Sequence, residues 1–142
     1  MITKSLGGWV FYIDDSIDHI ASLGKNTGKW MHFFTDIDFI ADICRRAVET
    51  GVVFEAKHTD DDTGVACFYL DFDDMDGHKK VLSFFLDNDL IRKTKSGRLY
   101  NISFKLDDQT RSGQYGEEFV AKLSLDEFVD LHTGEWLDNK DI

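Results

Sequence analysis

Short runs of aromatic and branched residues recur along the chain between glycine-rich and aspartate-rich stretches, a pattern typical of β-strands. In the first half of the chain they predict strands at 8–13, 29–34, 52–58 and 65–70. The last of these is apolar on both faces and is expected at the centre of a sheet. The turn-like sequence at 59–64 predicts that the strands on either side of it pair as a hairpin.

Other segments carry apolar residues at three- and four-residue spacing, which predicts amphipathic helices. The clearest runs from Ile37 to Val48; Thr35 is its expected cap, in a spacing close to a capping box, and Gly51 follows its end. A short helix is expected after Asp15. Two more helices are expected at 76–86 and 124–131.

The second half of the chain predicts another hairpin, with strands at 91–94 and 99–107, and a short strand near 119–123. The core order is therefore strand, helix, strand, strand, helix, strand, strand, helix. Because the links between paired strands are of hairpin length, this order predicts an α+β fold with a curved, largely antiparallel sheet and helices packed on one face. No linker or repeat divides the chain, so residues 1–142 are expected to form a single domain.

Alternation along two of these strands indicates a binding face. In one strand Glu55 and Lys57 point opposite to Ala56, and in the other Lys105 points opposite to Phe104. If the helices cover one side of the sheet, Lys57 and Lys105 share the other side. An open, polar sheet face is therefore the expected ligand-binding surface.

The charge of the chain narrows the possible partners. With 27 acidic and 16 basic residues the net charge is −11, which argues against general binding to nucleic acid or to an anionic membrane. There is neither an apolar stretch long enough to cross a membrane nor an export signal, so a soluble, cytoplasmic protein is expected. The segment 76–115 nevertheless has 8 basic and 5 acidic residues. Its basic side chains lie near Tyr100 and Tyr115, a combination that suits a ligand whose phosphate oxygens bind the cations while its base stacks on a ring. The alternative interpretation is a solvated hairpin whose basic side chains balance acidic neighbours.

Motifs for catalysis or for a cofactor are missing from the sequence. Cys44 and Cys67 lie among apolar neighbours and are expected to be buried thiols. The acidic run 71–77 does not follow the pattern of a calcium-binding loop, and the histidines lack the spacing of a zinc site. No Ser-His-Asp signature or phosphate-binding glycine loop occurs. The sequence predicts no metal and no cofactor, and it favours a binding protein over an enzyme.

Several short motifs between about residues 28 and 115 resemble a small uncharacterised family from bacteria and animals. The motifs are Gly28-Lys-Trp-Met31, Glu55-Ala-Lys57, Val65-Ala-Cys-Phe-Tyr69 with Asp71 and Asp73-Asp74, and Phe104-Lys105 with Asp107, Thr110, Gly113 and Tyr115. Some members are labelled phosphothreonine lyases, and the family is held to share the fold of the messenger-RNA cap-binding initiation factor. The resemblance implies a curved sheet backed by helices, with Lys57, Lys105, Thr110 and Tyr115 contacting a phosphate-bearing ligand.

The lyase activity that this resemblance suggests requires a lysine base and a histidine acid. Lys57 and His58 are adjacent in a predicted strand, so they point to opposite faces, which counts against that activity.

The sequence therefore predicts a small binding module for a nucleotide or another phosphate-bearing ligand. The candidate contacts are Lys57, Arg92, Lys105, Thr110, Arg111 and Tyr115. A second hypothesis is an acidic inhibitor of the kind phages make against nucleic-acid-handling defence systems, an anti-CRISPR-like protein that presents carboxylates to a protein partner in place of phosphates. A phosphothreonine-lyase-like enzyme is the third.

Overall fold

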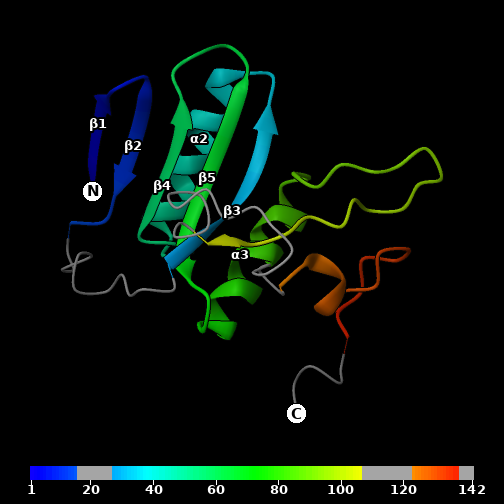
Figure 1. Cartoon of the computed structure of the whole chain (residues 1–142). Helices are drawn as coiled ribbons and strands as arrows, with labels where there is room; N and C mark the ends of the chain where they lie inside the picture. The colour runs from blue at the N-terminus through cyan, green and yellow to red at the C-terminus, as the bar shows by residue number, and fades with distance from the viewer. Residues whose placement is uncertain (16–26, 107–122, 138–142) are drawn as a thin grey trace.

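The computed structural model describes residues 1–15, 27–106 and 123–137 of the chain. Within them, six strands form one antiparallel sheet in the order β1-β2-β4-β5-β3-β6 (Figure 1). The strands are β1 (Ile2–Leu6), β2 (Trp9–Ile13), β3 (Thr27–Phe34), β4 (Glu55–Thr59), β5 (Gly64–Asp71) and β6 (Lys105–Leu106). The remaining elements are the helices α2 (Ile37–Glu49) and α3 (Met75–Asp87) and the 3-10 turn η1 (Leu125–Glu127). The α+β class with an antiparallel sheet is confirmed.

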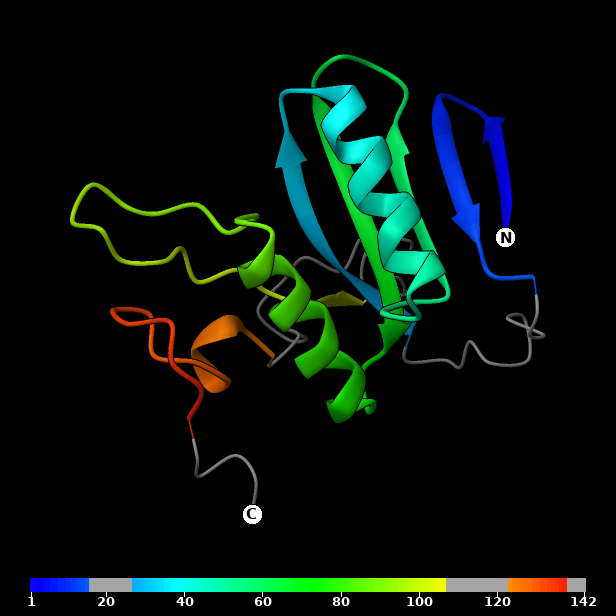
Figure 2. The ribbon, with the colours of Figure 1, turned by 180° about the vertical axis from the view of Figure 1, so that it is seen from behind.

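Both helices lie on the same side of the sheet, the side turned to the viewer in Figure 2. Helix α2 buries one stripe made of Ile40, Ile43, Cys44, Ala47 and Val48. Helix α3 buries Val81, Leu82 and Phe85, and the Phe85 ring meets Phe68 of β5 edge to face at 5.1 Å. The apolar spacing recognised in the sequence thus corresponds to the faces that form the core.

The cap of α2 is one residue later than expected. Asp36, and not Thr35, accepts hydrogen bonds from the backbone N–H groups of Asp38 (3.0 Å) and Phe39 (3.3 Å). A carboxylate also interacts favourably with the positive end of the helix dipole, which a threonine hydroxyl does far less. At the other end Gly51 has φ +79°, the left-handed conformation that ends many helices.

The strand register assigns each side chain to a face, because directly paired residues of an antiparallel sheet point the same way. Trp30, Phe68, Ala56 and Tyr12 are paired in succession across four strands and are all buried beneath the helices. Their sequence neighbours point to the opposite side, here called the outer face, which Figure 1 views directly.

Two buried histidines lie on the helix side of the sheet: His78 of α3 bonds to the sheet, and His58 of β4 bonds within it. Trp30 Nε1 donates to His78 Nδ1 (3.0 Å), and His78 Nε2 lies 2.8 Å from the Phe72 carbonyl. His58 bridges the Tyr12 hydroxyl (3.0 Å) and the Thr59 carbonyl (2.9 Å) in a similar way. For His78 the roles are fixed: the Phe72 carbonyl can only accept and the Trp30 N–H can only donate, so Nε2 carries the proton, Nδ1 accepts, and the ring is neutral.

The second predicted hairpin is shorter than expected. Its arms pair only near the turn, through the isolated bridge between Lys93 and Leu99 and the hydrogen bonds from Thr94 N to Arg98 O (2.6 Å) and from Tyr100 N to Arg92 O (2.8 Å), and β6 comprises two residues. Other backbone groups of this segment bond to the C-terminal segment: Leu99 N donates to Leu131 O, and Phe104 N donates to Leu123 O, both at 2.9 Å. Tyr100 is 51% exposed.

Two further differences from the predicted element order lie at the ends of the chain. The last helix, expected at 124–131, is reduced to η1. At the other end, the sequence analysis did not predict β1. This strand pairs with β2 across Gly7 and Gly8, which both have positive φ; a Gly-Gly pair between two strands is a hairpin signal that could have identified β1. The helix expected after Asp15 lies outside the described residues, as does most of the strand expected near 119–123.

Candidate functional site

The candidate site is the outer face of the sheet. The register places Lys57 and Lys105 there, together with Lys29, which the sequence analysis did not select. Lys29 pairs directly with Lys105, so their Cβ atoms are about 5 Å apart. Lys57 is three strands away from Lys105, about 14 Å across the sheet. Lys57 and Lys105 share the face, but they are too far apart to hold the same phosphate group.

Aromatic rings surround the lysine of β4. Lys57 Nζ lies 4.0 Å from the centroid of the Trp9 ring, 5.5 Å from Phe11 and 5.7 Å from Tyr69. Lys29 Nζ lies 6.0 Å from the centroid of the same Tyr69 ring. Contacts of this kind contribute about 0.5–1 kcal/mol each when exposed and more when desolvated. Tyr69 is buried, whereas Trp9, Phe11 and the two lysines are half-buried, so the face places partly accessible rings next to ammonium groups.

The charge of the outer face differs in sign from that of the whole chain. Among the residues of the six strands, every charged side chain points to this face. These residues are Lys4, Lys29, Lys57, Lys105, Glu55 and Asp71. The strands therefore present four cations and two anions on the outer face of a chain with a net charge of −11. That balance favours a negatively charged ligand over a positively charged one.

Arg92 lies elsewhere. Its Nη2 donates to the Phe33 carbonyl at 3.3 Å, beside the end of β3. There it borders a cavity of about 370 Å³ lined also by Met31 and Tyr100. The structure does not bring Arg92 together with Lys57 and Lys105. The remaining predicted contacts, Thr110, Arg111 and Tyr115, lie outside the described residues.

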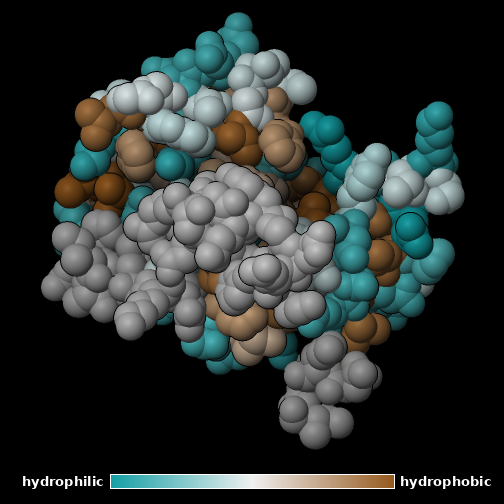
Figure 3. Space-filling model, in the orientation of Figure 1, coloured by the Kyte–Doolittle hydropathy of each residue, from teal (hydrophilic) through white to brown (hydrophobic). Residues whose placement is uncertain are grey.

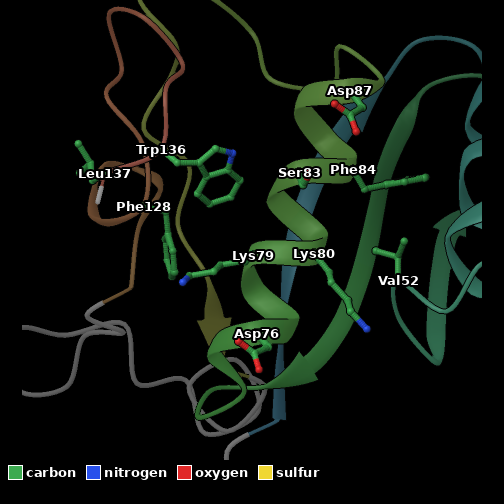
Figure 4. Close-up of a pocket in the computed structure, with 10 residues that line it drawn as sticks. All are labelled: Val52, Asp76, Lys79, Lys80, Ser83, Phe84, Asp87, Phe128, Trp136 and Leu137. Carbon is green, nitrogen blue, oxygen red and sulfur yellow. The ribbon is translucent and has the colours of Figure 1, made fainter. Parts of the chain in front are cut away.

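A larger cavity, of about 540 Å³, lies between α3 and the C-terminal segment (Figure 4). Its lining combines charged and aromatic side chains: Val52, Asp76, Lys79, Lys80, Ser83, Phe84, Asp87, Phe128, Trp136 and Leu137. The Lys79 side chain extends toward Phe128, whereas Lys80 points to the other side of α3, toward Val52. The two amino groups therefore diverge, and the sequence gave no local signal for this cavity because its walls are about fifty residues apart.

Buried groups near the site are unsuited to catalysis. The Cys44 thiol is fully buried, and burial raises its pKa, which keeps it protonated and inert. His58 is buried against Tyr12 on the helix side, opposite to Lys57, so the lysine and histidine that a lyase would need do not share a surface. Burial also raises the pKa of Tyr12 to about 12.

The described residues contain no group of three or more His, Cys, Asp or Glu side chains placed to hold a metal ion. Their helices are all too short or too polar to cross a membrane. A comparison with protein-family models finds no match for this chain, and a search of curated proteins finds none either. The family resemblance therefore stays a prediction, and the function has to be inferred from the geometry.

Proposed function

We propose that the protein is a binding module for a nucleotide or another phosphate-bearing molecule with an aromatic ring, held on the outer face of the sheet. The observation that carries this proposal is the clustering of Lys57 and Lys29 around Tyr69, with Trp9 and Phe11 beside them. Aromatic side chains interleaved with cations are the usual means by which proteins hold bases and phosphates together.

The dimensions of the cluster suit such a ligand. Lys57 and Lys29 are two strands apart, roughly 10 Å, which is comparable to the distance between the base and the terminal phosphate of a nucleotide. A base held beside Lys57 would direct its phosphates toward the pair Lys29 and Lys105. Lys29 and Lys105 project from directly paired positions, so one phosphate group is able to contact both ammonium groups.

The finer expectations from the sequence belong to the same proposal. A curved sheet of the cap-binding type would place the ligand on this face, and a nucleotide ligand is in keeping with a cytoplasmic location. Among the described residues Lys57 and His58 lie on opposite faces of the sheet, which supports a binding module over a lyase.

The acidic-inhibitor hypothesis has less specific support. On α2, two of the three carboxylates that would imitate phosphates are already paired: Asp42 with Arg45 and Arg46, and Glu49 with Arg45 at 2.7 Å. Exposed pairs of this kind contribute little stability, but they neutralise the charge of the helix surface. This surface is therefore not a row of bare carboxylates.

Calorimetric titration with ATP, GTP, AMP and inorganic phosphate tests the proposal. We expect a nucleotide to bind the wild type, and Lys57→Gln and Lys29→Gln to weaken that binding about tenfold each, the loss of one charge-assisted contact. Lys80→Gln is the matched control, because it removes an exposed lysine of α3 and should leave the affinity unchanged. Absence of heat with all four compounds, or equal losses in the control, would refute the proposal.

A further inference from the structure

The C-terminal half of β3 is an edge of the sheet. β3 pairs with β5 along its whole length, from Thr27 to Phe34, but β6 lies opposite Gly28 and Lys29 alone. Beyond these residues, no strand among the described residues pairs with the second side of β3, and Figure 1 shows this side without a neighbouring strand. An uncovered strand edge is a template for pairing with another extended chain.

The hydrogen bond from Arg92 fixes which backbone groups face this edge. Because Arg92 approaches from outside the sheet and donates to the Phe33 carbonyl, the backbone of Phe33 points away from β5. Alternate residues of a strand direct their backbone groups the same way, so Met31 does likewise, in phase with Lys29 opposite β6. Met31 and Phe33 thus offer two N–H groups and two carbonyls, spaced for an added strand.

A pocket for side chains adjoins these backbone groups. The cavity of about 370 Å³ is lined by Met31, Phe33, Leu90, Arg92 and Tyr100, among others. Two of the aromatic side chains are unusually accessible: Phe33 is 58% exposed and Tyr100 is 51% exposed. The pocket therefore suits an apolar side chain, with one guanidinium group at its border.

The charge next to the edge identifies the occupant. The stretch from residue 90 to residue 106 contains five basic residues and no acidic one, although the chain as a whole is strongly acidic. Four of the five, Arg92, Lys93, Lys95 and Arg98, lie on the segment 92–98, which projects from the body of the molecule and is largely hydrophilic in Figure 3. Such a segment beside an open strand favours an acidic peptide.

We propose that the edge of β3 at Met31 and Phe33 binds an extended acidic peptide as an additional strand. A peptide N–H takes the Phe33 carbonyl that Arg92 now holds, and Arg92 pairs with a peptide carboxylate instead. An apolar side chain of the peptide enters the cavity beside Tyr100. Backbone pairing supplies the affinity, and the cavity and the cations supply the selectivity.

Fluorescence anisotropy on the full chain tests this inference. The probe is a labelled seven-residue peptide in which glutamate alternates with valine or leucine, and its matched control has lysine at every glutamate position. We expect the acidic peptide to bind, and amide resonances of Met31 and Phe33 to shift more than that of His32 in NMR spectra, since His32 pairs with β5. No acidic binding up to about 1 mM, or equal binding of both peptides, would overturn the proposal.

Two variants separate edge pairing from non-specific attraction. Arg92→Glu should weaken the acidic peptide about tenfold and strengthen the lysine peptide, a reversal that loss of folding cannot produce. Phe33→Pro removes an edge N–H but none of the bonds to β5, and should abolish binding of the acidic peptide while the far-ultraviolet circular dichroism stays unchanged. Unaltered affinity in both variants would refute edge pairing. A second refuting outcome is a dimer in sedimentation experiments that pairs through this edge and that the peptide does not dissociate.

Discussion

The two faces of the sheet use the same kinds of residue for opposite purposes. On the helix side Tyr12 meets His58 and Trp30 meets His78, each pair buried and joined by a hydrogen bond. On the outer face the partner of the rings is the half-buried lysine Lys57. Buried polar groups that bond to each other stabilise the fold, whereas a cation beside a ring can also interact with a ligand. The comparison therefore separates residues that hold the fold together from residues available for binding.

The largest expected effect lies on the helix side. Phe68 is fully buried at the centre of β5, in contact with Phe85. Replacing it with alanine removes that contact and leaves a cavity, so we expect Phe68→Ala to lower the free energy of unfolding by about 3–5 kcal/mol. Urea unfolding of the wild type and the variant measures this loss of free energy. A loss below about 1 kcal/mol would mean that this face does not carry the core.

A methyl group at Gly28 should have the next largest effect. A Cβ there would lie 2.5 Å from the Lys105 carbonyl and 2.6 Å from the Phe104 ring. Because the carbonyl belongs to the backbone of β6, we expect Gly28→Ala to cost about 1–3 kcal/mol by pushing β6 away from β3. The same variant should weaken nucleotide binding, since β6 carries Lys105. If the Gly28→Ala variant kept both the stability and the nucleotide affinity of the wild type, the close approach of β3 and β6 would be contradicted.

The buried histidines predict how stability depends on pH. Burial lowers the pKa of His78, and the hydrogen bond to the Phe72 carbonyl opposes this effect only in part. The unfolded chain, with a histidine pKa of about 6.5, then binds a proton more readily than the folded chain. Stability is therefore complete above about pH 6.5 and falls as the pH drops through this value toward the lower pKa of the folded state, by at most about 1.4 kcal/mol per pH unit.

Urea unfolding at a series of pH values between about 7.5 and 5 checks the direction of this effect. Burial lowers the pKa of His32 as well, so both rings contribute in the same direction. His78→Asn should flatten the profile, whatever it does to the stability at neutral pH. A profile that rises toward acid, or one that the substitution leaves unchanged, would show that His78 is not held neutral by its surroundings.

Local patterns in the sequence predicted the elements whose partners are close in the chain. The helix from Ile37 and the hairpin of β4 and β5 follow from spacing and turn residues alone. The hairpin in segment 91–104 was predicted correctly only near its turn, because other backbone groups of the segment bond to residues around 123–131. β1 escaped notice because it is an edge strand with every residue exposed, so its apolar alternation is weak.

For the candidate site, too, the sequence predicted only the part that depends on a local pattern. Alternation within a strand was enough to assign Lys57 and Lys105 to one face, since it requires no knowledge of the neighbouring strands. Lys29, Trp9 and Phe11 were not selected because their positions depend on strand order. β2 lies next to β4, and β3 lies between β5 and β6, so the neighbours in the sheet are not neighbours in the sequence. Strand order is a property of the whole fold and is not encoded in a local period.

The smallest expected effect on stability concerns the outer face and tests the comparison most directly. In a double-mutant cycle of Trp9→Leu and Lys57→Met, which retains the aliphatic stem of the lysine, we expect a coupling energy of about 0.5–1 kcal/mol from the contact at 4.0 Å. Each single variant should nevertheless weaken nucleotide binding clearly, because a ligand needs both the ring and the charge. A coupling of several kcal/mol would instead make this pair part of the structural framework, and the distinction between the two faces would no longer hold.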